Sequence, residues 1–71
     1  MKRSEITQTE NDRIRVTYRN KVGAINSVCG YLKSLSNSYI VWQPFGGQNQ
    51  LSKKLEDVQS VVKINGEKEI V

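Results

Sequence analysis

Residues 13–19 are the segment that most restricts the fold, because apolar and polar side chains alternate along it without a break. The apolar residues are Ile14, Val16 and Tyr18, and the polar ones are Arg13, Arg15, Thr17 and Arg19. Successive side chains of a β-strand point to opposite faces of the sheet. The segment is therefore predicted to be a strand with one apolar face and one cationic face.

Residues 22–36 carry two conflicting signals. Four apolar residues are spaced as on one face of a helix: Ile25, Val28, Leu32 and Leu35. The same segment holds two Gly, three Ser and one Asn beside β-branched and aromatic residues, a composition that disfavours a helix. We predict a long strand that bends at Gly23 or Gly30, with a bulge between Ile25 and Val28. The alternative is an α+β fold with a helix at 23–36.

The remaining segments predict shorter strands and turns. Asn20-Lys21 is expected to form a tight hairpin turn, and Gly46-Gly47 a two-residue turn after a strand at 39–45. Four apolar residues are spaced by four, three and four positions: Leu51, Leu55, Val58 and Val62. This spacing predicts a short helical turn near 52–57, which leads into a strand at 59–64. Asn65-Gly66 predicts a sharp turn, and residues 67–71 form a final short strand or a frayed end.

These elements fit one small domain. Residues 1–12 are polar, lack an apolar period and are predicted to form a flexible N-terminal arm that adds no residue to the core. Several short, bent strands in so short a chain are best accommodated by a partly closed barrel, since closure removes unpaired strand edges. We therefore predict a mainly β fold, a small five-stranded, partly open barrel over residues 13–71.

The chain resembles the Sm-like and YolD-like families of small β-barrels in three segments: IRVTYRN, GYLKSLSNSYIVW and LEDVQSVVKI. The matching motifs are Gly30-Tyr31-Leu32 for the Gly-x-Leu of the second strand, Ile40-Val41-Trp42 for the third, and Glu56-Asp57-Val58 with Val61 for the last. The resemblance covers about residues 13–64 and implies an Sm-like or SH3-like barrel. RNA-binding Sm-type proteins carry an Asp and an Asn after Gly-x-Leu, where this chain has Ser36 and Asn37.

The composition excludes several kinds of site. The 71 residues include no His and one Cys, so His-dependent triads, Cys/His zinc sites and an intramolecular disulfide are excluded. Apolar runs are no longer than three residues, which gives neither a membrane span nor the apolar region of a signal peptide. We predict a soluble, cytoplasmic protein that is not an enzyme, uses no cofactor or metal and does not bind a membrane.

The excess of positive charge is confined to the first half of the chain. Eleven Lys and Arg against seven Asp and Glu give a net charge of +4, and the whole excess lies in residues 1–36. Because no acidic residue occurs between Arg13 and Ser36, this region attracts polyanions. The candidate contacts are the cations of the first strand and those near it: Arg13, Arg15, Arg19, Lys21 and Lys33. We predict a small basic module that binds RNA or single-stranded DNA on this strand face.

The aromatic residues indicate a second kind of surface. Trp42 is predicted to lie in the core, because burying the only Trp removes the largest apolar area from water. Tyr31, Tyr39 and Phe45 are available to stack on bases. Tyr39 and Phe45 are also candidate partner-binding residues, which supports an alternative function as a protein-interaction or regulatory adaptor.

Such an adaptor would be a phage-like small protein or a polymerase-associated YolD-like factor. It would bind its partner through a sheet edge or through the 42–47 loop. The sequence leaves open whether the chain forms a homo-oligomer.

Overall fold

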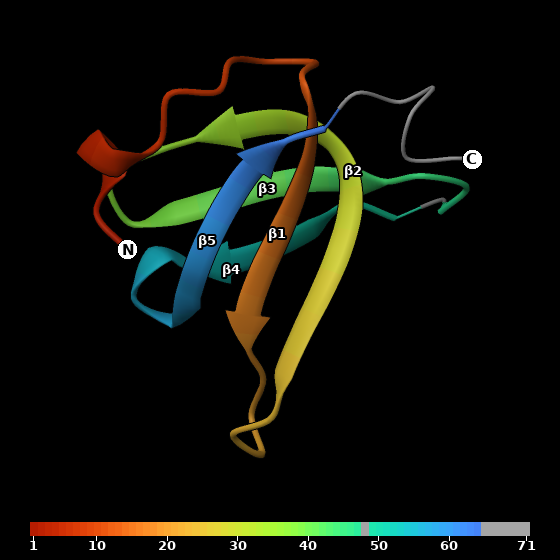
Figure 1. Cartoon of the computed structure of the whole chain (residues 1–71). Helices are drawn as coiled ribbons and strands as arrows, with labels where there is room; N and C mark the ends of the chain where they lie inside the picture. The colour runs from red at the N-terminus through yellow and green to blue at the C-terminus, as the bar shows by residue number, and fades with distance from the viewer. Residues whose placement is uncertain (48, 65–71) are drawn as a thin grey trace.

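The computed structural model describes residues 1–47 and 49–64, which form one antiparallel β-sheet (Figure 1). The elements are η1 (Arg3–Glu5), β1 (Arg13–Arg19), β2 (Ile25–Leu35), β3 (Tyr39–Pro44), β4 (Leu51–Lys54), η2 (Leu55–Asp57) and β5 (Val58–Lys63). The order across the sheet is β4-β3-β2-β1-β5, and β4 is not paired with β5. The predicted mainly β fold of five strands in a partly open barrel is confirmed for these residues as five antiparallel strands in one sheet that does not close.

Helical structure within the described segments is limited to the two 3-10 turns. Each comprises three residues, so neither is long enough to cross a membrane. The predicted turn at Asn65-Gly66 and the predicted strand at 67–71 lie outside the described residues.

β2 is extended along its whole length, so the alternative with a helix at 23–36 is wrong. The helix-like spacing of its apolar residues has another cause, a shift in the register of β2 against β3 between Leu32 and Ser34. Because this bulge adds one residue, Leu32 and Leu35 both pack against the core although they are three positions apart. The bulge predicted between Ile25 and Val28 is absent, since β2 keeps one register with β1 there and Ile25 is simply exposed.

Gly30 lies where β2 begins to pair with β3 while it still pairs with β1. Residues 25–31 pair with β1 and residues 30–35 pair with β3, so Gly30 and Tyr31 have a partner on each side. A Cβ atom on Gly30 would lie 2.7 Å from the carbonyl carbon of Gln43 and closer still to its oxygen. Only glycine lets the two backbones approach this closely. Figure 1 shows that β2 is strongly curved, and this curvature accompanies its pairing with β1 on one side and β3 on the other.

The β1–β2 loop is longer than the two-residue turn predicted at Asn20-Lys21. The Asn20 N–H donates to the Ala24 carbonyl at 2.8 Å, and Gly23 adopts a positive φ of 87°. The Asn20 Oδ1 atom accepts hydrogen bonds from the N–H groups of Val22 and Ala24, each at 3.0 Å. This is a three-residue loop closed by a left-handed glycine, a common hairpin connection.

Two further predicted boundaries differ from the structure. The turn after β3 has Phe45 and Gly46 at its centre, rather than Gly46-Gly47, because the Gly47 N–H donates to the Pro44 carbonyl at 3.1 Å and Gly46 has φ 73°. The helical turn predicted near 52–57 is shorter, because residues 52–54 belong to β4 and only Leu55–Asp57 is helical.

Trp42 is fully buried, as predicted, and is the largest of the fully buried side chains. Its ring meets that of Tyr18 edge to face, with 5.9 Å between the ring centres. The Lys53 Nζ atom lies 4.8 Å from the centre of the Tyr18 ring. Since these residues belong to β3, β1 and β4, side-chain contacts link parts of the open sheet that backbone hydrogen bonds do not join.

The N-terminal segment contributes to the core, so the prediction that residues 1–12 add no core residue is wrong. Ile6 is 3% exposed and belongs to the buried cluster. The amino group of Met1 donates to the Leu55 carbonyl at 2.7 Å, which ties this segment to η2. Ile6 was missed because one apolar residue among polar neighbours produces no periodic signal.

Replacing Gly30 by Ala is expected to lower the free energy of unfolding by about 1–3 kcal/mol, because the added methyl group forces the β2 and β3 backbones apart. Urea denaturation followed by the fluorescence of Trp42 measures this change. The exposed Ser34 of the same strand gives the control S34A, which should change stability by less than about 0.5 kcal/mol. Equal stability of both variants would contradict the close contact.

Replacing Ile6 by Ala is expected to cost about 2–4 kcal/mol, since it leaves a cavity in the core. The same denaturation experiment compares it with T7A, a truncation of the exposed neighbouring side chain. If the N-terminal segment were not packed, I6A and T7A would be equally harmless.

Candidate nucleic-acid interface

β1 presents its arginines on the outer face of the sheet, as the alternation predicts. Ile14 and Val16 are fully buried, whereas Arg13 and Arg15 are half-buried and Arg19 is exposed. The neighbouring strand β2 places Tyr31 opposite Arg13. The cationic face of β1 therefore continues into an aromatic side chain of β2.

Four residues form a continuous surface on this face, which we call the Tyr31 patch: Arg13, Tyr31, Lys33 and Phe45. The Arg13 guanidinium carbon lies 5.9 Å from the centre of the Tyr31 ring, and the Lys33 Nζ atom lies 6.0 Å from it. The Phe45 ring meets Tyr31 edge to face, with 4.8 Å between ring centres and an angle of 75° between ring planes. Tyr31 is thus the centre of the patch, and it contacts the other three side chains.

Backbone pairing fixes the positions of these four side chains. Tyr31 lies opposite Arg13 on β1 and opposite Gln43 on β3, and the Phe45 N–H donates to the Cys29 carbonyl at 3.2 Å. Lys33 sits at the bulge of β2, and its ammonium group donates to the Asn11 side-chain oxygen at 3.3 Å. The patch is built from rigid strands and one short turn.

Among the residues that the structure describes, no acidic side chain pairs with a cation of the patch. Within the described residues, neither Arg13 nor Lys33 has a carboxylate within 4 Å. Asp12 precedes Arg13 in the chain, but its side chain pairs with Lys63 at 3.9 Å and accepts a hydrogen bond from the Thr9 N–H. Two cations held beside one ring repel each other, and a bound anion would relieve that repulsion.

The structure does not gather all five predicted cations. Arg15 follows Arg13 on the same face of β1, next to the patch. Arg19 lies at the far end of β1, about 20 Å from Arg13 at 3.3 Å per residue. Arg19 lines a small hollow with Glu56, Asp57 and Gln59, and Lys21 is exposed in the β1–β2 loop.

The two predicted partner-binding aromatics are both exposed but lie apart. Phe45 is 43% exposed and belongs to the Tyr31 patch, whereas Tyr39 is 46% exposed at the opposite end of β3. About 20 Å of strand separates them. Tyr39 instead lines a groove with residues of the N-terminal segment and the β4–η2 junction.

The joining of cations and aromatics through Tyr31 could not be predicted from the sequence, because it depends on the register of the β1–β2 hairpin. A tight turn at Asn20-Lys21 would place Val28 opposite Arg13. The three-residue loop found in the structure places Tyr31 there instead. The available signal was Gly23, which favours the left-handed conformation that closes such a loop.

No group of three His, Cys, Asp or Glu side chains that could hold a metal ion occurs among residues 1–47 and 49–64. Comparison of the chain with protein-family models, with curated proteins and with solved structures finds no match.

Proposed function

We propose that the protein is a small non-enzymatic module that binds single-stranded nucleic acid, RNA or DNA, on the Tyr31 patch. The proposal rests on one observation: the exposed Phe45 ring packs against the half-buried Tyr31 ring, and beside Tyr31 lie two cations that have no acidic partner in the described residues. Proteins that bind single strands combine aromatic rings, on which bases stack, with cations that follow the phosphates.

The two rings of the patch have different roles in this proposal. The Tyr31 ring is occupied by the edge contact with Phe45 and by the two cations beside it. The Phe45 ring is 43% exposed and is therefore the surface on which a base stacks. Tyr31 is a positioning residue that holds Phe45, Arg13 and Lys33 in one arrangement.

The cations of the patch contact the phosphates on either side of the stacked base. Arg13 and Lys33 lie 5.9 Å and 6.0 Å from the centre of the Tyr31 ring, and in the proposed complex each meets a phosphate of the same strand. Arg15 extends this contact along β1, while Arg19 and Lys21 are too distant for direct contact and contribute only long-range attraction.

Binding of an unstructured oligonucleotide with a 5′-hydroxyl end is expected to depend on Phe45. Replacing Phe45 by Ala should weaken binding about tenfold, which corresponds to the loss of one stacked base. The matched control is Y39A, since Tyr39 is equally exposed but lies at the other end of β3. Fluorescence anisotropy at about 50 mM salt measures both affinities. An equal loss in both variants, or no binding by the unmodified protein, would contradict the proposal.

The salt dependence of binding tests the cations separately. Each contact between a cation and a phosphate contributes about 0.7 to the slope of log K against log salt concentration for a single strand. R13Q should therefore lower the slope by about 0.7. The control R19Q removes the same charge from the same strand face and should lower the slope by less than R13Q does, because Arg19 makes no direct contact with a phosphate. If R13Q and R19Q had the same effect, only the net charge would matter and the patch would not be the site.

The adaptor alternative makes the opposite prediction in the same experiments. If a protein partner docks on the 42–47 loop, F45A should abolish binding of that partner. The oligonucleotide would then fail to bind even the unmodified protein. Measuring both kinds of binding with one set of variants therefore distinguishes the two functions.

A further inference from the structure

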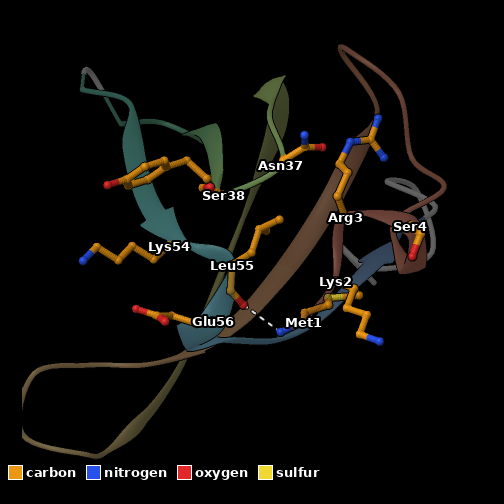
Figure 2. Close-up of a pocket in the computed structure, with 10 residues that line it drawn as sticks. Met1, Lys2, Arg3, Ser4, Asn37, Ser38, Lys54, Leu55 and Glu56 are labelled. Atoms are coloured by element: carbon orange, nitrogen blue, oxygen red, sulfur yellow. Dashed lines mark hydrogen bonds between the residues drawn. The ribbon is translucent and has the colours of Figure 1, made fainter.

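A second polar surface lies at the end of the sheet away from Phe45, in a groove of about 820 Å³ (Figure 2). Three segments line the groove: the N-terminal residues 1–4, the β2–β3 turn with Tyr39, and the β4–η2 junction at residues 54–56. A volume of this size is typical of sites that hold a small molecule. Neither the charge pattern of β1 nor the proposed function involves these residues.

Hydrogen bonds between the three segments fix the shape of the groove. The Met1 amino group donates to the Leu55 carbonyl at 2.7 Å, the bond drawn in Figure 2, and the Leu55 N–H donates to the Ser38 carbonyl at 2.8 Å. Leu55 is 3% exposed and anchors the floor of the groove in the core. Arg3 is held by a hydrogen bond from its Nη1 atom to the Ile6 carbonyl at 3.1 Å. The groove is therefore formed before any ligand binds.

The charged side chains around the groove are mostly cationic. Lys2, Arg3 and Lys54 line it, against one carboxylate, that of Glu56. In the described part of the chain, none of the three cations has a carboxylate within 4 Å. Figure 2 shows the Arg3 guanidinium and the Asn37 amide reaching the same end of the groove, while Lys2 and Lys54 carry their ammonium groups to other sides.

We infer that this groove binds a phosphomonoester group, with Arg3 and Asn37 as the direct donors. The Arg3 guanidinium uses one nitrogen for Ile6 and retains donors that match phosphate oxygens. The Asn37 side chain makes no hydrogen bond within the described residues, so its amide is available as a further donor. A phosphomonoester carries close to two negative charges at neutral pH, and the excess of cations suits it better than a singly charged phosphodiester. Lys2 and Lys54 strengthen this attraction from a distance, and Glu56 opposes it.

The phosphate has two possible sources that share this chemistry, a free nucleotide and the terminal phosphate of an oligonucleotide. The groove and the Tyr31 patch lie at opposite ends of β3, about 20 Å apart. The two sites can therefore be tested separately, and the inference does not depend on the proposed function.

The test is a titration of the isotopically labelled protein with uridine 5′-monophosphate and with uridine, at constant ionic strength, followed by amide chemical shifts. The nucleotide should shift the amides of residues 2–4 and 37–39, and uridine should not.

N37D adds a negative charge where the phosphate binds and should weaken nucleotide binding at least about fivefold. E56Q removes the opposing charge and should tighten binding about twofold. The matched control for charge is K21Q, in the exposed β1–β2 loop, and F45A controls for the patch; both should leave nucleotide binding unchanged.

Several results would overturn the inference. These are equal binding of uridine and its monophosphate, shifts centred on Tyr31 and Phe45, or equal weakening by N37D and K21Q. Asn37 lies in an exposed turn, so N37D should fold normally. A second variant, R3Q, should also weaken nucleotide binding, and circular dichroism checks that it is folded.

The source is a nucleic-acid end if an oligonucleotide with a 5′-phosphate binds at least about fivefold more tightly than one with a 5′-hydroxyl. N37D should then remove this difference in affinity. Binding of the free nucleotide without that difference identifies a small molecule. If F45A abolishes oligonucleotide binding but not nucleotide binding, the two sites are independent.

Discussion

The close passage of β2 past β3 at Gly30 is the constraint on which the rest of the structure depends. Because no side chain separates the two backbones there, β2 pairs with β1 on one side and with β3 on the other within a single strand. The bulge that follows at Lys33 turns Leu35 back toward the core. One position without a side chain and one extra residue thus let five short strands enclose Trp42.

The same pairing builds the candidate interface. It puts Leu32 inside and Tyr31 outside, opposite Arg13, and it brings Phe45 from the end of β3 against the Tyr31 ring. The same strand pairing therefore positions both the buried core residues and the residues of the Tyr31 patch. A substitution that moves β2 relative to its neighbours would disturb both, whereas F45A removes an exposed ring and should leave the core intact.

Side chains complete the core where the sheet stays open. Lys53 of β4 lies against the Tyr18 ring of β1, and Tyr18 meets Trp42. At the end of the sheet, Ile6 fills a core position and the Met1 amine is bonded to Leu55. The N-terminal segment thereby has two consequences, since it adds apolar contact and it also supplies Lys2 and Arg3 to the groove.

The sequence determined the features that depend on local pattern. The alternation of Ile14, Val16 and Tyr18 predicted the strand, its buried face and its outer arginines, and the single Trp predicted the centre of the core. The burial of Ile6, the length of the β1–β2 loop and the site of the β2 bulge were decided only by tertiary structure. The burial of Ile6 and the β2 bulge depend on contacts between residues far apart in the chain. The loop is closed by contacts within residues 20–24, and the hairpin register follows from that closure rather than from periodicity. That is why the cations could be identified from the sequence, while their arrangement around Tyr31 could not.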